Sequence, residues 1–525
     1  MRPLVERLAN FLPAAIALAL PTVFVPWAVD AYILPRASIV IVGACVGAGI
    51  ALLLPLTPSL GQLRLPLLAA AAAAILAFAF TVSWPLSAVG SYTRYESLPM
   101  RLAYLVLLAV PVWCLRSERP RELVAGAFVF GTSIASIEAL LQVAGGVEFR
   151  PDGNIGNANL LGALIAMAFP LAVARALRFD RLVFAWWLAA AVMVGGLVAS
   201  TSRSGGLGAL AGCLALVVFA LRGRVAVMAA AASITAMAVA LMLVVMGPLG
   251  ALNNDPARSR LQLWPDALRM IAARPITGWG EDATGLVFGR FLSADYSPGV
   301  TFDRVHSGPL DIAATMGLLG LIALGWVMVV LFRGVWQGRF SASVAAFGAA
   351  CVGYSVWAVF NFDWAPATGV FWLLAGTAWS GLGGTEAIEA TPAAAQGPLS
   401  SKAIRPLGAL GLAVLAIALG LMPLLADGWY FNGRADLAVV ADPLQSRYHW
   451  VRGEDLIAAG KAHEGLAELR RAAQLGETEP QLYVELGDEE KALGDPAQAR
   501  RAYMMALAID PYYAPAKQKL ASLNA

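Results

Sequence analysis

An arginine and a histidine have the side chains with the most distinctive chemistry in this chain. Arg203 lies in the run Thr-Ser-Arg-Ser-Gly-Gly at 201–206, whose small residues allow a tight turn. Its planar guanidinium group fits a phosphate or a diphosphate, although an arginine at a membrane boundary can equally be an anchor whose charged end reaches water. His306 can accept a proton near neutral pH and so activate a hydroxyl group, although a lone histidine is more often structural. Asp303 and Asp311 either orient it or are simply solvated.

A long polar segment from about 248 to 305 precedes that histidine. The apolar residues that recur in it at helical spacing are Leu261, Trp264, Leu268 and Ile271. This stripe predicts a short amphipathic helix lying at the membrane interface, with Arg258 and Arg260 on its polar side. A structural lid would show the same stripe, so the stripe alone assigns no function.

The elements that must position these residues are membrane spans. The chain has 525 residues, of which 59% are hydrophobic and 14% charged, and a span needs roughly 20 apolar residues. We therefore predict an all-α protein, a polytopic transmembrane bundle of about 12–13 spans. The expected spans are 11–29, 38–56, 66–83, 101–115, 122–143, 158–175, 182–200, 206–221, 225–246, 306–332, 342–361, 366–382 and 406–426.

The arginines of the connections predict the orientation of the bundle. Positively charged residues concentrate in cytoplasmic loops, and a cytoplasmic N-terminus places most of them inside. These are Arg64, Arg116, Arg119, Arg121, Arg175, Arg178, Arg181, Arg222, Arg224, Arg333, Arg339, Lys402 and Arg405. The polar motifs then fall together on the outside: Arg94, Gly156-Asn157-Ala158-Asn159, Arg203, the long segment, His306 and Asn361-Phe362-Asp363, with Arg36 and Arg150.

Composition and motifs exclude several classes of function. The net charge of +3 reflects the loop arginines and does not indicate nucleic acid. All four cysteines lie within predicted spans, and neither a metal-binding spacing of Cys and His nor a phosphate-binding loop is present, so no metal or other cofactor is expected. Charged residues are nearly absent from the span centres, which argues against an ion-coupled transporter.

The C-terminal part of the chain predicts a separate helical domain. After the membrane region 1–382 we expect a cytoplasmic linker at 383–404, a last span at 405–426 and an outside tail at 427–525. The tail fits a 34-residue tetratricopeptide-like (TPR-like) template. Its signature positions are Tyr483, Leu486, Gly487, Ala499, Tyr503, Ala506 and Pro511, with a weaker repeat at Gly453, Gly465, Leu469 and Ala472. The alternative is a plain helical hairpin packed on the membrane domain.

The order of these motifs over 1–382 resembles the O-antigen ligase and O-antigen polymerase family of bacterial envelope glycosyltransferases. The runs that carry the resemblance are 30–36, 90–95, Leu141-Gln142 with Gly145, 156–159, 202–206, Arg260 to Trp264, 275–280, His306 and 316–320. The sequence departs from the family at Ser307, where asparagine is usual, and at the acidic pair Glu281-Asp282.

The resemblance implies a fold and a reaction. The fold is similar to that of C-type glycosyltransferases, and the reaction moves a glycan from an undecaprenyl-diphosphate carrier to an acceptor hydroxyl without metal or nucleotide. It implies Arg203 and Arg260 as diphosphate binders and His306 as the base. Guanidinium groups placed near the leaving diphosphate would stabilise the charge that develops on it.

The resulting hypothesis is an inverting glycosyltransferase in the bacterial inner membrane, with its active face and its tail periplasmic. Arg94 and Arg258 are further candidates for diphosphate binding, and Asn157 and Asn159 order the site or contact sugar. The expected partners are the lipid-linked glycan, an acceptor glycan, lipid or protein, the bilayer, and a protein bound by the tail.

Two other classes of function stay open. A flippase or exporter of lipid-linked glycan would use the arginines to line a path, and a non-catalytic scaffold for envelope assembly would act through the tail. Ligase and polymerase activities are not separable from these residues, because both use the same donor.

Overall fold

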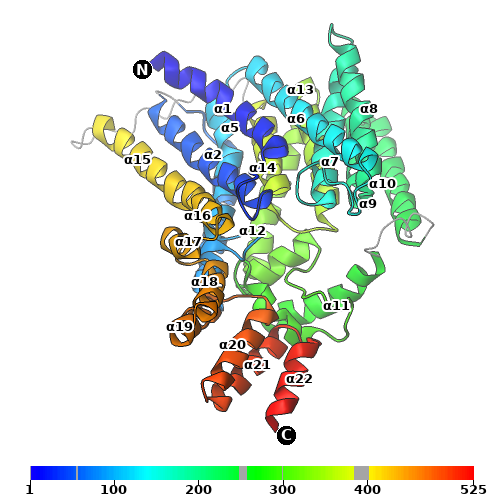
Figure 1. The fold of residues 1–525 in the computed structure, drawn as a ribbon. Coiled ribbons are helices and arrows are strands. Elements are labelled where there is room, and N and C mark those ends of the chain that lie inside the picture. Colours follow the sequence, from blue (N-terminus) through cyan, green and yellow to red (C-terminus); the bar gives the residue numbers. More distant parts are fainter. Residues whose placement is uncertain (1, 55–56, 247–256, 298, 383–400, 525) are drawn as a thin grey trace.

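The computed structural model describes residues 2–54, 57–246, 257–297, 299–382 and 401–524, and the regular elements of these residues are all helices (Figure 1). The predicted all-α class is confirmed. The first half of the bundle consists of α1 (Arg2–Thr22), α2 (Ile33–Leu53), α3 (Arg64–Ala79), α5 (Leu98–Cys114), α6 (Glu118–Ala144), α7 (Ala158–Ala176) and α8 (Val183–Ser200). The second half consists of α9 (Arg203–Ala220), α10 (Gly223–Met246), α12 (Gly308–Gly338), α13 (Ala342–Ala358), α14 (Ala365–Ser380), α15 (Ser401–Ala416) and α16 (Met422–Phe431).

Ten helices within the described ranges are long and apolar enough to cross a membrane, and α5 and α13 are shorter apolar helices. The protein is therefore a multi-pass membrane protein. Each predicted span overlaps one of the helices named above, although the ends differ. The first span was expected at 11–29, but α1 ends at Thr22, and a turn closed by the bond from Val25 N to Ala31 O follows it. The last span extends to Phe431, beyond the predicted 426. The predicted linker falls mostly outside the described residues.

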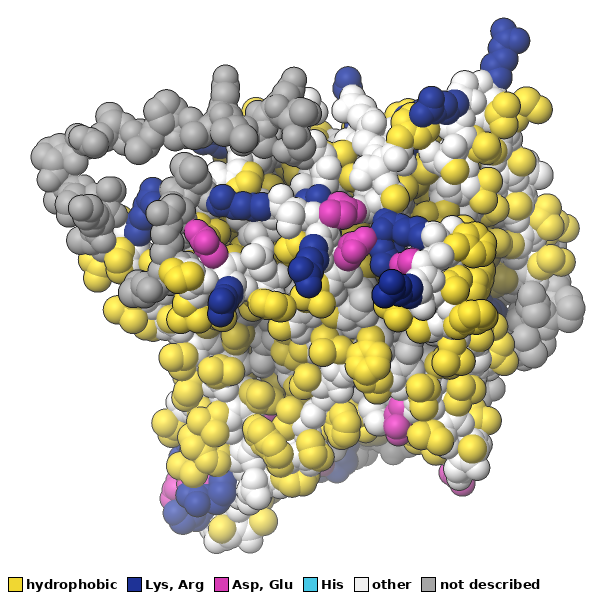
Figure 2. Space-filling view, turned by 90° about the horizontal axis from the view of Figure 1, so that it is seen from above, with side chains coloured by type: hydrophobic (Ala, Val, Ile, Leu, Met, Phe, Trp, Pro, Cys, Tyr) yellow, Lys and Arg dark blue, Asp and Glu magenta, His cyan; other side chains and the backbone are white. Residues whose placement is uncertain are grey.

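The connections separate onto the two ends of the bundle. The N-terminus and the connection between α7 and α8 lie at one end, and α11 (Ala257–Ala273) and the tail lie at the other (Figure 1). Seen from the first end, Lys and Arg side chains gather over the surface with few Asp and Glu (Figure 2). This separation agrees with the charge asymmetry of the sequence. Which end faces the cytoplasm stays a prediction.

The centre of the bundle is built by α7, α9 and α13, which approach one another at glycines. A Cβ atom added to Gly205 of α9 would lie 2.6 Å from Gly162 Cα of α7, and one added to Gly208 would lie 2.6 Å from the carbonyl oxygen of Gly353 in α13. Small residues let membrane helices pack at such short range. The first residues of α7 and α9 and the last of α13 are thereby brought together at the motif end.

The long segment between α10 and α12 contains α11 and two short 3-10 helices, η3 (Ala283–Leu286) and η4 (Phe288–Phe291). The predicted amphipathic helix is present, but its buried stripe is different from the one expected. Leu261 and Leu268 are exposed, whereas Ile271 of the predicted stripe is buried. Among the described side chains of α11, the buried apolar ones are Leu263, Ala267, Met270 and Ile271, and Asp266 is buried beside them.

Two motifs of the sequence meet at a break in α12. Gly317 has φ 66° and ψ −170°, which interrupts the helix. The backbone there pairs with the turn at 275–280: Trp279 N donates to Ala314 O (2.9 Å), and Leu318 N donates to Pro275 O (2.7 Å). A Cβ atom on Gly317 would lie 2.2 Å from the carbonyl oxygen of Ile276, so only glycine fits.

The tail forms two helical hairpins and a terminal helix. After α17 (Ala435–Ala441) come α18 (Ser446–Ala458) with α19 (Ala462–Leu475), α20 (Pro480–Ala492) with α21 (Pro496–Ile509), and α22 (Ala514–Asn524). Within each pair a glycine admits a large side chain: a Cβ on Gly487 would lie 2.4 Å from the Tyr503 ring, and one on Gly453 2.8 Å from Leu469. The TPR-like assignment itself stays a prediction.

Candidate functional site

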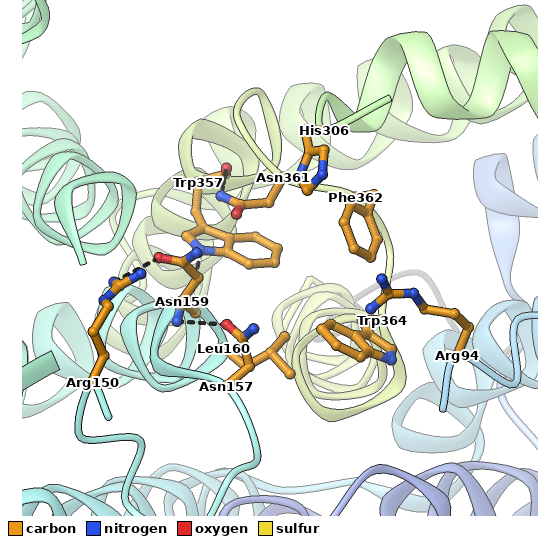
Figure 3. A pocket seen from close by; sticks show the side chains of 10 residues that line it. All are labelled: Arg94, Arg150, Asn157, Asn159, Leu160, His306, Trp357, Asn361, Phe362 and Trp364. Atoms are coloured by element: carbon orange, nitrogen blue, oxygen red, sulfur yellow. Dashed lines mark hydrogen bonds between the residues drawn. The ribbon is translucent and has the colours of Figure 1, made fainter. Parts of the chain in front are cut away.

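Four of the predicted site residues line one cavity of about 240 Å³ at the motif end of the bundle. They are His306, Arg94, Asn157 and Asn159, and they come from segments that lie far apart in the sequence (Figure 3). The remaining lining residues are Arg150, Leu160, Trp357, Asn361, Phe362 and Trp364. The cavity is smaller than the roughly 300–1,000 Å³ of pockets that enclose a drug-sized ligand. It can therefore hold one part of a large substrate, such as a headgroup or one sugar.

The asparagines belong to the first turn of α7 and are held by their neighbours. Asn157 is the N-cap of α7, and its side chain accepts a bond from Asn159 N (2.8 Å). The side-chain oxygen of Asn159 in turn accepts from Arg150 Nη2 (3.2 Å) and from Ser202 Oγ (3.4 Å). Arg150 also donates to the carbonyl oxygen of Ser200 (2.9 Å). This network joins α7 to the connection between α8 and α9.

Aromatic side chains form another side of the cavity. The Trp357 indole N–H donates to Asn159 O (3.0 Å), which fixes the ring at the end of α13. The Asn361 amide donates to Trp357 O (2.9 Å) and to Ser204 Oγ (3.1 Å). Trp364 donates its indole N–H to the carbonyl oxygen of Thr93, in the connection between the short helix α4 (Trp84–Val89) and α5. The aromatic rings therefore have fixed orientations around the cavity.

Arg94 points to the same cavity from the α4–α5 connection. Its guanidinium carbon lies 4.5 Å from the Trp364 ring centroid and 5.1 Å from that of Phe362. Asp303 accepts two bonds from it, at 2.6 and 3.2 Å. Burial alone would raise the pKa of Asp303, but Arg94 and then His306 outweigh it, and the pKa is lowered. The carboxylate of Asp303 is therefore held in its ionised form as the half-buried partner of Arg94.

His306 occupies a strained backbone position just before α12. Its φ is 55°, in the left-handed region that residues other than glycine rarely adopt. The ring is half-buried, and its centroid lies 5.3 Å from that of Phe362 in an edge-on arrangement. The predicted span began at this residue, but α12 begins at Gly308 after the N-cap Ser307. His306 therefore precedes the helix and faces the cavity rather than the membrane.

A buried arginine two residues before His306 fixes that position. Arg304 is 1% exposed, donates to Asp311 (2.8 Å) and is also bonded to Asp282. Asp282 further accepts from the backbone N–H groups of Ser91 and Glu96 at 2.8 and 3.1 Å. Asp311 is thus an ion-pair partner of Arg304. Arg304 therefore ties the segment before the candidate base both to α12, through Asp311, and to the residue just before η3, through Asp282.

A second buried arginine fixes the aromatic side of the cavity. Arg101, in the first turn of α5, pairs with Glu281 at 2.9 Å and with Asp363 at 2.5 Å. Asp363 lies between Phe362 and Trp364, so this pair holds the segment that carries both rings. The acidic pair Glu281-Asp282, which departs from the family pattern, is thereby explained as the partner of Arg101 and Arg304.

The remaining candidates do not line the cavity or lie outside the described side chains. Arg203 is the first residue of α9 and is half-buried, and it is not among the ten lining residues. Its neighbours Ser202 and Ser204 bond to Asn159 and Asn361, so Arg203 starts from the edge of the cavity. The side chains of Arg258 and Arg260 lie outside the described residues.

Sequence analysis did not assign functions to several lining residues. Arg150 was placed outside but given no role, because a single loop arginine resembles an interfacial anchor. Asn361 and Phe362 were noted as polar irregularities, and their position after a span at the motif end was the available signal. Trp357 and Trp364 carried no signal, since tryptophans are common at membrane boundaries.

Residues 188–325 match the family whose description is O-Antigen ligase. The matched part runs from α8 to α12 and includes Arg203, Arg258, Arg260 and His306, whereas Arg94, Asn157 and Asn159 lie outside it. No curated protein matches the chain. The protein thus contains a region similar to O-antigen ligases, within the stretch 1–382 over which the sequence resembles that family. The match does not extend to the tail.

Proposed function

We propose that the protein is a membrane glycosyltransferase that moves a glycan from an undecaprenyl-diphosphate carrier to an acceptor hydroxyl. One observation carries the proposal: His306, from the region similar to O-antigen ligases, shares a single cavity with Arg94, Asn157 and Asn159 at the motif end of the bundle. A lipid carrier would keep its isoprenoid chain beside the apolar helices and present its diphosphate at this level.

The proposed chemistry needs one base and a stabilised leaving group. His306 accepts the proton of the acceptor hydroxyl, whose oxygen attacks the anomeric carbon of the donor sugar. The bond from that carbon to the diphosphate oxygen breaks, and the carrier diphosphate leaves with the electron pair. Attack from the opposite side inverts the anomeric configuration. Arg203 and Arg260 are proposed to bind the diphosphate, with Arg94 and Arg258 as further candidates, and they stabilise the negative charge that it gains.

The asparagines and aromatic rings suit the sugar part of the donor. Asn157 and Asn159 present amide groups to the cavity, and amides donate to and accept from sugar hydroxyls. The acceptor is a glycan, a lipid or a protein hydroxyl. The first of these would make the protein a polymerase and the others a ligase.

The test is glycan transfer by the purified protein in detergent with a lipid-linked donor. His306→Ala is expected to abolish transfer, and Arg203→Ala and Arg260→Ala to lower it on the order of 10²–10³-fold. His463→Ala is the matched control, because that histidine is exposed on the tail. Undiminished transfer by His306→Ala removes the proposed base.

The same assay separates the other two functions. A flippase or exporter needs two compartments and so shows no transfer in detergent. A scaffold would need the tail and not His306, so a chain shortened before 427 would lose its function in cells while His306→Ala would keep it.

A further inference from the structure

The tail contacts the membrane domain at the end of the last span, around a buried aspartate of α16. Asp427 of α16 is fully buried and accepts from Tyr92 Oη (2.6 Å) of the α4–α5 connection and from Tyr448 Oη (3.3 Å) of α18. Gln445, just before α18, donates to the carbonyl oxygen of Gly90 (3.3 Å). The tail is therefore attached to the connection that carries Arg94, and it is not merely joined to the end of a span.

A second contact lies at the turn between α19 and α20. A Cβ on Gly285 of η3 would lie 3.1 Å from Thr478 Cγ2 and 3.4 Å from Asp303 Cβ. Thr284 Oγ1 donates to the carbonyl oxygen of Asp303 (2.8 Å). Gly285 thus packs against Thr478 of the tail and against Asp303. The residue that holds Arg94 has the tail directly behind it.

Electrostatic coupling agrees with this packing. Burial and the neighbouring Glu477 raise the pKa of Glu479, and Asp303 raises it further while Arg94 opposes the rise. The charges of the turn 477–479 therefore act on the ion pair at the cavity.

A third contact closes the other side of the long segment. A Cβ on Gly289 of η4 would lie 2.2 Å from the carbonyl oxygen of Ile509 at the end of α21. The backbones of η4 and α21 touch there with no room for a side chain. Together the three contacts surround the segments that supply Arg94 and Asp303.

We propose that the tail is a fixed part of the transferase site, in which the turn 477–479 holds Asp303 and, through Asp303, orients Arg94 in the cavity wall. This inference rests on the proposed function. Asp303 and the tail are positioning elements, since Arg94 alone of this group lines the cavity. A ligand or protein that displaced the tail would then change transfer without entering the cavity.

The contact at Gly285 allows a direct test of docking. An ideal Cβ on Gly285 lies 3.3 Å from Thr478 Cβ, close to the roughly 3.8 Å between the Cβ atoms of a disulfide. The parent is the full chain with its four cysteines replaced by alanine: Cys45, Cys114, Cys213 and Cys351. The pair Gly285→Cys/Thr478→Cys should link under oxidation, and mass spectrometry of the linked peptides measures the yield whether or not the protein transfers glycan.

Displacement of the tail should lower transfer, and the link should restore it. Gly289→Leu inserts a side chain between η4 and α21. If the cysteine pair still links at the yield seen without this change, Gly289→Trp provides a larger wedge. Since a misplacement of about 1 Å can lower a rate about 10²-fold, we expect a loss of about tenfold or more. Oxidation of the added cysteine pair should return transfer toward the parent's rate, and a reductant should remove the gain. Gln474→Leu, on an exposed face of α19, is the control.

Two results overturn the inference. One is a wedge variant that links poorly yet transfers at the parent's rate, since the tail would then have no part in the site. The other is a cysteine-pair variant without the wedge whose oxidised link lowers transfer several-fold, since the tail would then have to move. Asp303→Asn should reproduce the loss with the tail still docked. A parent that transfers no glycan removes the proposed function as well, whereas the two results above remove only the role of the tail.

Discussion

Replacement of Arg304 by methionine tests how the candidate base is held. Methionine keeps much of the side-chain volume and removes the charge between Asp282 and Asp311, both of which are buried. Removal of one partner from a buried ion pair costs about 3–5 kcal/mol, because the other charge is left without compensation. Asp282 keeps its bonds from two backbone N–H groups, whereas Asp311 keeps only a long one from Val305 N (3.4 Å). We therefore expect Arg304→Met to lower the free energy of unfolding by about 3 kcal/mol, near the lower end of this range.

A loss of about 3 kcal/mol is smaller than the roughly 5–15 kcal/mol of a typical domain. The bundle should therefore stay folded while the segment around His306 relaxes. A residue in the left-handed region is strained by about 1–3 kcal/mol and keeps that conformation only while its surroundings impose it. Once His306 leaves it, the ring moves from the cavity, and transfer should fall by about a hundredfold.

The assay compares Arg304→Met with Arg304→Lys and with Arg434→Met. Lysine restores the charge but cannot bond to both carboxylates as a guanidinium does, so we expect intermediate transfer and partial recovery of the melting temperature in detergent. Arg434 forms an ion pair on the exposed surface of the tail and should change neither measurement. An Arg304→Met protein that melts and transfers as the parent does would refute the view that this arginine positions His306.

Three further predictions concern the site's surroundings. Burial raises the pKa of Glu96 to about 8 from 4.5, so the native state binds one more proton than the unfolded state between these pH values. The melting temperature should therefore fall as pH rises from 4.5 to 8 and level off above, and Glu96→Gln should flatten this slope; an unchanged slope contradicts the assignment. Gly162→Ala places a Cβ 2.2 Å from Ser202 Oγ and should destabilise by about 1–3 kcal/mol, whereas Gly325→Ala, with open space around it, should not. Arg94→Lys keeps a charge but loses the two-pronged contact with its carboxylate partner, so transfer should fall about tenfold at unchanged melting temperature; equal transfer would show that charge alone suffices.

The fold could be predicted to a large extent because hydropathy is a local property. Each expected span coincides with a helix, since about 20 apolar residues cross a bilayer whatever their partners are. The ends were less predictable. The chain leaves α1 at Thr22 although apolar residues continue, because a turn and Pro26 follow, and no composition average records such a turn.

The site could be predicted only in part because its contacts join distant segments. The sequence indicated His306 and Arg94 by their residue types, but the bond between Arg94 and Asp303 spans 209 positions. The pairing of Arg101 with Glu281 is likewise set by the packing of α5 against the long segment. Without that geometry, the acidic residues after the turn at 275–280 were indistinguishable from solvated ones.

The interruption of α12 at Gly317 limits which segments of this protein can be exchanged independently of one another. Polar backbone groups that leave a membrane helix need other partners, because lipid cannot satisfy them, and here the turn 275–280 pairs with the backbone on both sides of the break. The broken helix and the turn therefore depend on each other. A chimera that exchanged the long segment but kept the original α12 would mismatch these backbone hydrogen bonds, so recombination among relatives should preserve the two as one unit.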